Sequence, residues 1–440
     1  VSSLLTSQVE VLLTTQVDVL LTAQTYVLNS TQIQSLTTIQ IPVIRTANIS
    51  SLTTMNIASL LTSQIIVLLP PQITSFTTAQ IVVLKSEQVQ TLNSRQVNAI
   101  TTLNISTLLT SQINFLYTSQ VNILLTSQIA SLLSVQTSIL KTDQIISLTT
   151  VQIPAITTLD INTLTTDQTD ALLTSQVYVL TTEQIVAINT AQINEMSSDQ
   201  LNAMTTIQVI AIETVDVQSI TNVNVSTLLT SQINVLTTAE AIALTTAQIQ
   251  SLTTIQIPAI TTLDINVLLT AQTYALLTSQ IVVITTSQLP VITTADISTL
   301  TTANINALLT SQIPALITSQ VVALRTVQIP ALTTTNVPVL LTSQINILSS
   351  AQVGAFETRQ IVVLTTIQVP AITTASILTL STDQINSVLT SQATALTTSQ
   401  INVLLTSQIS SLYTSQVEVL LTTQVDALLT AQSYVLHTTQ

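Results

Sequence analysis

The chain has 440 residues, of which 46% are apolar and only 6% are charged, and its formal net charge is −13. This composition excludes a charged disordered linker, and the absence of cysteine excludes disulfides and thiolate metal sites. The 6 basic residues form no basic stripe, so the sequence predicts no nucleic-acid partner.

An eight-residue unit repeats without insertion or deletion along the whole chain, in 55 consecutive rows. Clear examples are residues 233–240 (INVLTTAE) and 249–256 (IQSLTTIQ). Position 1 of this octad is Ile or Val in 46 rows, position 4 is always apolar, position 6 is Thr or Ser in all rows but two, and position 8 is Gln in 43 rows. Such a period is typical of a repeat array in which each unit buries its apolar face against neighbours. We therefore predict that residues 1–440 form a single continuous octapeptide-repeat solenoid.

Longer duplications are superimposed on the octad. Residues 1–32 and 409–440 match at 26 of 32 positions, and residues 145–176 resemble residues 249–280. The chain also lacks an initiator Met and a signal peptide. We expect the 440 residues to be a window of a longer repeat array.

The placement of charge predicts which octad positions face solvent. All 6 basic residues lie at position 5 or 7, and none of the 19 acidic residues lies at position 1, 4 or 6. Because burial of an unpaired charge is costly, positions that accept charge are expected to be exposed. Positions 2, 5 and 7 are thus predicted to point outward, and positions 1, 4 and 6 inward.

One architecture compatible with this pattern is an α-solenoid of capped mini-helices. In it, Thr at position 6 would cap a short helix, Gln at position 8 would lie in its first turn, and positions 1, 4 and 5 would form the apolar stripe. Residues 180–188 (LTTEQIVAI) fit this pattern. Against it, Pro occupies position 2 in eight rows, and Pro in a helix interior costs about 3 kcal/mol.

The alternative that we favour from the sequence is an all-β fold, a β-solenoid or parallel β-helix of 55 octads. The high content of Ile, Val and Thr agrees with strands, and each coil would hold either two or three octads. Thr at position 6 and Gln at position 8 would point inward and form ladders with the next coil, so replacing Gln232 by Leu would destabilise by about 1–3 kcal/mol. The scarcity of Gly for tight corners is the weak point of this prediction.

The sequence contains no candidate catalytic, cofactor-binding or metal-ligating residue. His437 is the only histidine and is expected on the surface, so neither a Ser-His-Asp triad nor a two-His metal site is predicted. Gly354 is the only glycine, which argues against a Gly-rich phosphate loop. Acidic residues are spread along the chain, and no apolar run approaches the roughly 20 residues that span a bilayer. We predict no enzyme activity, no cofactor and no membrane span.

The phrase LTTxQI occurs at residues 36–41, 148–153 and 252–257. It resembles the Thr/Gln-rich octapeptide repeats of very large bacterial surface or secreted proteins that are described as fibres or adhesin-like. The resemblance implies an extracellular or cell-surface stalk, sheath or fibre, and it carries over no binding residues. The external ligand of such a protein is unknown from the sequence.

The leading functional hypothesis is a structural protein that associates with its own copies, laterally or end to end. Leu is frequent at position 5, for example Leu109, Leu125 and Leu173; these side chains either lie half-buried at a corner or form an apolar stripe for lateral packing. The alternative is a binding module, either an adhesin stalk or an ice-binding solenoid. Ice binding requires outward Thr rows, and the predicted inward direction of position 6 counts against it.

Overall fold

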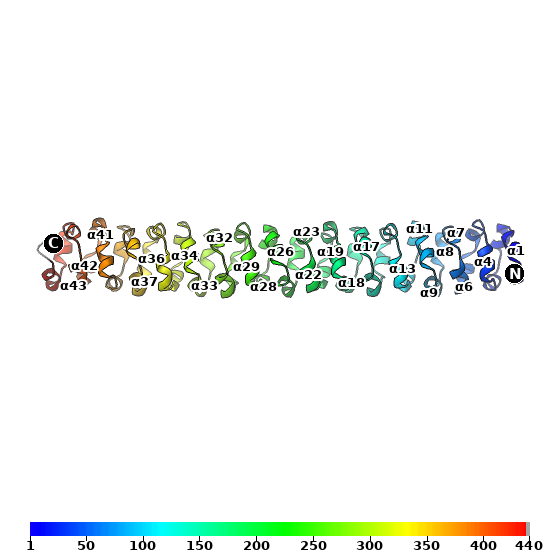
Figure 1. Ribbon diagram of the computed structural model, residues 1–440, viewed down its shortest axis with the longest axis horizontal. Helices are drawn as coiled ribbons and strands as arrows, with labels where there is room; N and C mark the ends of the chain where they lie inside the picture. Colours follow the sequence, from blue (N-terminus) through cyan, green and yellow to red (C-terminus); the bar gives the residue numbers. More distant parts are fainter. Residues whose placement is uncertain (437–440) are drawn as a thin grey trace. The chain divides into compact units, whose positions relative to one another are not determined.

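The computed structural model describes residues 1–436 and divides into two units, Val1–Ile220 and Thr221–Gln440, each considered by itself (Figure 1). Among the described residues there are short α-helices and 3-10 helices and no β-strand. The prediction of an all-β fold, a β-solenoid or parallel β-helix, is therefore wrong. The mini-helix solenoid that was kept as the alternative is the architecture found.

In the first unit the α-helices are α1 Thr6–Glu10, α2 Thr14–Asp18, α3 Thr22–Tyr26, α4 Ser30–Ser35, α5 Thr46–Ser51, α6 Thr54–Ser59, α7 Thr62–Ile65, α8 Pro70–Thr74, α9 Thr78–Val82, α10 Ser86–Gln90, α11 Ser94–Asn98, α12 Thr102–Thr107, α13 Thr110–Asn114, α14 Thr118–Val121, α15 Thr126–Ile129, α16 Ser134–Thr137, α17 Thr142–Ser147, α18 Thr158–Thr163, α19 Thr166–Asp170, α20 Thr174–Val177, α21 Thr182–Ala187, α22 Thr190–Glu195, α23 Ser198–Ala203, α24 Thr206–Ile210 and α25 Thr214–Val217. Its 3-10 helices are η1 Ile41–Val43 and η2 Ile153–Ala155.

In the second unit the α-helices are α26 Asn222–Thr227, α27 Thr230–Asn234, α28 Thr238–Ala243, α29 Thr246–Ser251, α30 Thr262–Val267, α31 Thr270–Tyr274, α32 Thr278–Ile281, α33 Thr294–Thr299, α34 Thr302–Ala307, α35 Thr318–Ala323, α36 Thr342–Ile347, α37 Ser350–Gly354, α38 Thr358–Ile361, α39 Thr374–Ile377, α40 Thr382–Asn386, α41 Thr390–Ala395, α42 Thr398–Val403, α43 Thr406–Ser410, α44 Thr414–Val417, α45 Thr422–Asp426 and α46 Thr430–Tyr434. Its 3-10 helices are η3 Ile257–Ala259, η4 Leu289–Val291, η5 Ile313–Ala315, η6 Thr326–Ala331, η7 Val337–Val339 and η8 Val369–Ala371.

Each octad supplies one helical turn and one corner. In α21, for example, the helix begins after Thr181, whose backbone is extended (φ −75°, ψ 161°), and ends before Ile188, which is also extended (φ −66°, ψ 129°). Octad positions 4 and 5 therefore form the corner, and the α-helix runs from position 6 to position 1, 2 or 3 of the next row. No described residue has a positive φ, so these corners do not require glycine.

A capping box starts the helices that have Thr, Ser or Asn at the N-cap and Gln three residues later, such as α9, α21 and α42. The Thr181 hydroxyl oxygen accepts a hydrogen bond from the Gln184 backbone N–H at 3.2 Å, and Gln184 Oε1 accepts one from the Thr181 N–H at 2.9 Å. This reciprocal pair is the reason that the spacing Thr-x-x-Gln favours a helix start. The N-cap is thus octad position 5, one residue before the predicted cap at position 6.

Each coil contains three octads, which is one of the two coil lengths that the sequence allowed. Helices whose starts are three octads apart pack against each other, as α4 does on α6 and α18 on α21 in the first unit, and α28 on α30 and α33 on α35 in the second. The successive turns can be followed in chain order within each unit in Figure 1. An isolated helix of one turn is unstable in water, so stacking of the coils must stabilise the helices.

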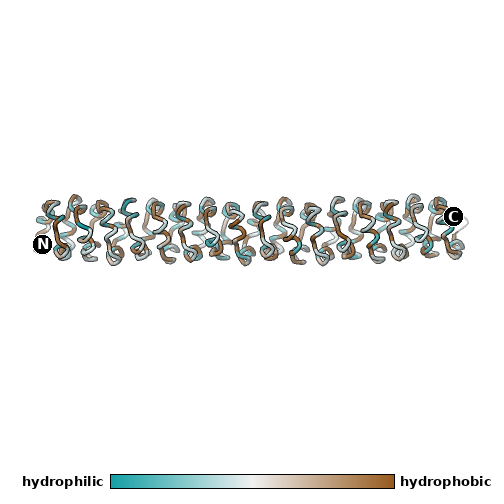
Figure 2. Tube along the Cα trace, turned by 180° about the vertical axis from the view of Figure 1, so that it is seen from behind, coloured by the Kyte–Doolittle hydropathy of each residue, from teal (hydrophilic) through white to brown (hydrophobic). Residues whose placement is uncertain are grey.

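The core consists of octad positions 1, 4 and 8. Ile33 at position 1 is 1% exposed, Leu36 at position 4 is 5% exposed, and Gln40 at position 8 is 2% exposed. Figure 2 shows the resulting alternation of hydrophobic and hydrophilic segments along the trace within each unit. The inward predictions for positions 1, 4 and 8 agree with the structure. The prediction for position 6 is wrong, because residues such as Thr38 and Thr342 are exposed there.

Proline at position 2 fits the helical fold because each helix is so short. All eight rows with this proline form 3-10 helices, η1 to η8. Elsewhere the N–H at position 2 bonds to the carbonyl at position 6, as Asn122 does to Thr118 at 2.9 Å. Proline removes this bond but leaves earlier ones, such as Ile41 N–H to Thr37 O at 3.1 Å. The cost of about 3 kcal/mol that we expected holds for proline in a helix interior. Position 2 lies at the end of the helical turn, so this cost does not apply there.

Candidate functional site

The most repeated polar feature of both units is the buried side-chain amide at position 8. Gln344, which is 1% exposed, accepts a hydrogen bond from the Leu341 N–H through Oε1 at 2.8 Å. Its Nε2 donates to the backbone carbonyl oxygens of Ile313 and Leu316 at 2.9 and 2.7 Å. The same side chain therefore caps its own helix and binds the end of a helical turn about one coil earlier.

This geometry explains why position 8 is so rarely anything but Gln. The last carbonyl groups of a helix have no partner within that helix, and a buried carbonyl without a partner is costly. The Gln amide supplies donors to these groups and an acceptor to its own N-cap. Side-chain ladders between coils were expected from the sequence, but the partners are backbone groups. The Thr-x-x-Gln capping box is the sequence signal that could have indicated this arrangement.

A second set of amides, at position 2, connects coils in the opposite direction. Asn122 Nδ2 donates to the Ser147 carbonyl at 2.8 Å, and Asn162 Nδ2 donates to the Ala187 carbonyl at 2.9 Å. In the second unit Asn266 bonds Val291 in the same way at 2.8 Å. The high frequency of Asn at position 2 thus follows from bonds to the coil that comes 25 residues later.

Five acidic residues replace the amide at position 8 and are buried, like the Gln side chains of other rows. They are 2–4% exposed: Asp160, Asp216, Glu240, Asp264 and Asp296. Hydroxyl groups compensate some of them. Asp160, for example, accepts hydrogen bonds from the hydroxyls of Ser134 at 2.9 Å, Thr137 at 3.2 Å and Thr157 at 2.7 Å.

Two of these carboxyl groups have an oxygen that is buried without a hydrogen-bond partner, Glu240 Oε1 and Asp296 Oδ1. Burial raises the pKa of Glu240, and the negative charge of Asp264 raises it further, while hydrogen bonds from Thr237 lower it. At these two oxygens the coil lacks a hydrogen bond that buried polar atoms usually make.

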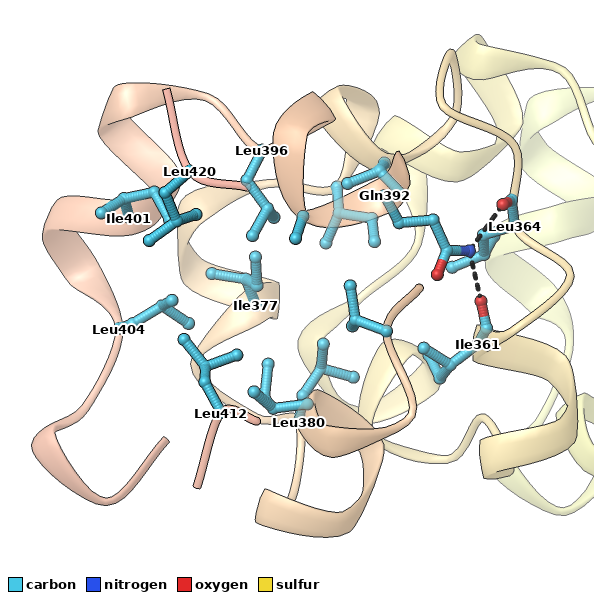
Figure 3. Close-up of a pocket in the computed structure, with 15 residues that line it drawn as sticks. Ile361, Leu364, Ile377, Leu380, Gln392, Leu396, Ile401, Leu404, Leu412 and Leu420 are labelled. Atoms are coloured by element: carbon cyan, nitrogen blue, oxygen red, sulfur yellow. Dashed lines mark hydrogen bonds between the residues drawn. The ribbon is translucent and has the colours of Figure 1, made fainter. Parts of the chain in front are cut away.

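The core of the second unit contains an apolar cavity of about 30 Å³ (Figure 3). Leu396, Leu404 and Ile377 line it, and Ala393 occupies a position 1 that Ile or Val fills in most rows. Figure 3 also shows Gln392 donating to the carbonyls of Ile361 and Leu364, at 2.8 and 2.6 Å. A space of this size and polarity is a packing defect rather than a ligand site.

Apolar side chains are exposed at positions 5 and 7. Leu109 and Leu133, the N-caps of α13 and α16, are 48% and 50% exposed, and α13 packs against α16. Val135 and Leu159 at position 7 are 60% and 65% exposed, and α16 packs against α18, which contains Leu159. We call these four residues the apolar patch. It lies on consecutive coils of the first unit.

Other kinds of site are not found in residues 1–436. That part of the chain has no group of three or more His, Asp or Glu side chains placed to hold a metal ion. None of its helices has the length and hydropathy that a membrane span needs. His437, which was expected on the surface, lies outside the described residues.

Comparison with known families supports the repeat architecture. Residues 180–214 and 289–326 match the ALTTAQ repeat family. A search of curated proteins found no match to the chain. The two matched segments contain complete octads of both units, so the chain is a tandem-repeat protein, and the giant fibre or adhesin-like relationship remains a hypothesis.

Proposed function

We propose that this chain is a structural repeat protein that associates with its own copies to build an extracellular or cell-surface fibre, sheath or stalk. The observation that carries the proposal is the apolar patch, Leu109, Leu133, Val135 and Leu159, exposed on consecutive coils. Contiguous exposed apolar surface is typical of interaction sites. A second copy can bring a similar row of side chains, because positions 5 and 7 repeat in every octad.

The coil itself supports a mechanical role. Buried amides connect successive coils through backbone carbonyls, as Gln344 does with Ile313 and Leu316, and the same octad design continues through both units. The proposal assigns the chain no catalytic activity, no cofactor and no nucleic-acid partner. The match to the ALTTAQ repeat family is consistent with an array of this kind.

The test is a variant in which the four patch residues are replaced by Thr at positions 109 and 133 and by Ser at 135 and 159. Thr and Ser occupy the same octad positions elsewhere, at Thr157 and Ser111, so the fold should be retained. We expect the wild type to sediment as oligomers or form filaments in electron micrographs, and the variant to remain monomeric with the same helical circular dichroism. Unchanged association of the variant would contradict the role of the patch.

Localisation is tested separately. Protease added to intact cells that produce the protein should digest it if it lies outside the cell, while an internal marker protein stays intact. Full protection of the chain under these conditions would contradict an extracellular role and leave the association experiment unaffected.

A second candidate, an ice-binding solenoid, is favoured by one observation. The nearly invariant Thr or Ser of position 6 is exposed, as at Thr38 and Thr342, so the reason given from the sequence against ice binding no longer holds. An ice-recrystallisation assay distinguishes the candidates: inhibition at low protein concentration would favour ice binding, and its absence favours the structural role. An adhesin stalk remains a variant of the structural proposal in which a separate domain binds the ligand.

A further inference from the structure

An open groove crosses neighbouring coils of the first unit where helix α7 packs against α10. Its volume is about 560 Å³, within the roughly 300–1,000 Å³ that is typical of small-molecule sites. Ser63, Glu87 and Tyr117 line it and are exposed, and Gln90 and Thr91 line it and are half-buried. None of these residues belongs to the apolar patch, so the groove needs a separate explanation.

Two hydrogen bonds fix the wall of this groove and leave other polar groups of its lining free. Gln90 Nε2 donates to the Phe115 carbonyl at 2.6 Å, and the Thr91 hydroxyl donates to the Glu87 carbonyl at 2.7 Å. In the part of the chain that the structure describes, the Glu87 carboxylate and the Tyr117 hydroxyl have no hydrogen-bond or ion-pair partner. These two groups are therefore available to a ligand.

The lining combines chemical groups that a sugar can use together. The Tyr117 ring, 55% exposed, offers a flat apolar face with a hydroxyl at its edge. The Glu87 carboxylate accepts hydrogen bonds, and the Ser63 hydroxyl both donates and accepts them. A pyranose sugar has C–H groups on its faces and hydroxyls around its edge, so it can stack on the ring and bond to both groups. Glu87 is the one charged residue of the lining, which fits a neutral ligand with many hydroxyls.

The same groups recur at the same spacing in the second unit. Of the 6 tyrosines, only Tyr117 and Tyr413 occupy octad position 5. An acid occupies position 7 in 6 of the 55 rows, and one such acid precedes each of these tyrosines by 30 residues. An amide and a hydroxyl precede each tyrosine by 27 and 26 residues. The three preceding residues are Glu87, Gln90 and Thr91 in the first unit and Asp383, Asn386 and Ser387 in the second.

The second set keeps the chemistry of the first but not its residues. Glu is replaced by Asp, Gln by Asn and Thr by Ser, whereas a recent duplication would have repeated the residues themselves. Tyr413 is 60% exposed and Asp383 is exposed, like their counterparts. One difference is that Arg359 takes the place of Ser63 and pairs with Glu357, so the second set differs in its charge.

We propose that each unit has a binding site for a neutral sugar chain, in which a pyranose ring stacks on the tyrosine and its hydroxyls donate to the nearby carboxylate. Tyr117 and Glu87 have these roles in the first unit, and Tyr413 and Asp383 in the second. A pyranose whose hydroxyls are all equatorial has the most apolar faces, so the ligand class is a β-linked chain of glucose-type units. The inference concerns each unit by itself and does not depend on the proposed fibre.

The experiment labels the 6 tyrosines of the full chain with fluorine and follows their nuclear magnetic resonance signals during a titration with cellotetraose to about 10 mM, which saturates a site of about 1 mM Kd. We expect two signals to shift, those that disappear in Tyr117→Leu and in Tyr413→Leu. Leu occupies position 5 in many rows, so both variants should fold. Each variant should leave the shift of the other tyrosine intact, because the two sites are independent.

Glu87→Ser tests the role of the carboxylate. Ser occupies position 7 elsewhere, as at Ser111, and the loss of a charged acceptor should weaken the binding that the Tyr117 signal reports by about tenfold. The Tyr413 signal of the same sample is the internal control and should keep its affinity. Asp199→Ser, which removes an exposed acid from the same octad position, should leave both affinities unchanged.

Three results would overturn the sugar sites. In the first, no tyrosine signal shifts, or all six shift alike, which would indicate no binding or a general effect of the solute. In the second, Glu87→Ser binds cellotetraose as tightly as the wild type does. In the third, the Tyr117 and Tyr413 signals respond to trilysine and not to cellotetraose, which would assign the carboxylate and the ring to a cationic peptide.

Discussion

At the scale of the residue, the fold depends on a side chain that is polar and yet belongs to the core. Gln at position 8 has both an acceptor and a donor, and the coil uses both, as Gln344 does between Leu341, Ile313 and Leu316. Asn is shorter and makes only part of this set: Asn56 Nδ2 donates to Leu28 O at 2.9 Å, but α6 begins without a capping box. The preference for Gln over Asn follows from this difference in reach.

Replacing Gln344 by Leu should lower the free energy of unfolding by about 1–3 kcal/mol, because buried backbone groups of Ile313, Leu316 and Leu341 lose their partners. Local hydrogen exchange around residues 313–345, or denaturant unfolding, measures the change. Ser343→Ala, next to it on the exposed surface, should stay within about 0.5 kcal/mol of the wild type. Equal stability of both variants would refute the role of the amide.

Ala393→Val should stabilise the second unit by about 1 kcal/mol, since it fills part of the 30 Å³ cavity with apolar atoms. Thermal unfolding of the two chains measures the gain. Ala351→Val, at an exposed position, is the matched control and should leave the midpoint nearly unchanged. A lower midpoint for Ala393→Val would mean that the core around Leu396 and Ile377 cannot accept the two added methyl groups.

At the scale of the element, the two consecutive threonines of the repeat have different roles. Thr397 is the N-cap of α42, and its hydroxyl accepts a hydrogen bond from the Gln400 N–H at 3.1 Å. Thr398 is the first helical residue and is exposed. Rows with Leu at the N-cap, such as Leu405, keep only the half of the capping box that Gln supplies.

Thr397→Ala should therefore cost about 1 kcal/mol, the usual value of a lost N-cap, and Thr398→Ala should cost much less. Both changes remove one threonine from the same helix, so each is the control for the other in an unfolding titration. The opposite order of stabilities would restore position 6 as the cap and contradict the assigned helix start.

Much of the core, but not the secondary structure, could be predicted from the sequence. Burial at positions 1, 4 and 8 followed from the strict apolar and amide pattern. The choice between strand and helix failed for identifiable reasons. Proline at position 2 was weighed as an interior residue, although a helix of one turn has almost no interior, as η1 shows at Pro42. The exclusion of charge from position 6 was interpreted as burial, whereas Thr38 is exposed at the first turn of the helical segment.

The groups that compensate the buried acidic residues could not be predicted from the sequence, for a different reason. Charge at position 8 occurs in few rows, and the residues next to Asp160 in the sequence do not show which groups compensate it. Two of the compensating hydroxyls, those of Thr137 and Ser134, are 23 and 26 residues away in the sequence. They become neighbours of Asp160 only once the three-octad coil is known.

At the scale of the whole molecule, the period of eight matters more than the identity of any one octad. Deleting one complete octad, residues 345–352, places an equivalent row in the vacated position, so helical circular dichroism and thermal stability should change little. Deleting the exposed Ala351 alone moves all later residues by one octad position and misaligns bonds such as that from Gln352 to Leu324. We expect the single deletion to be the more destabilising, by several degrees in the unfolding midpoint. Equal tolerance of both deletions would contradict a coil held in register by position 8.

The bonds of position 8 reach back 28 to 31 residues and no farther, as Gln64 does to Leu36 and Ile33. The Gln of each octad that leaves a ribosome or a secretion pore therefore meets its backbone partners in chain that has already emerged. Loop closure at this length has a small and constant entropic cost, so the time to fold should grow in proportion to the number of octads. A fragment of three octads would contain no such bond. The length of the array can then increase by duplication without creating a harder folding problem.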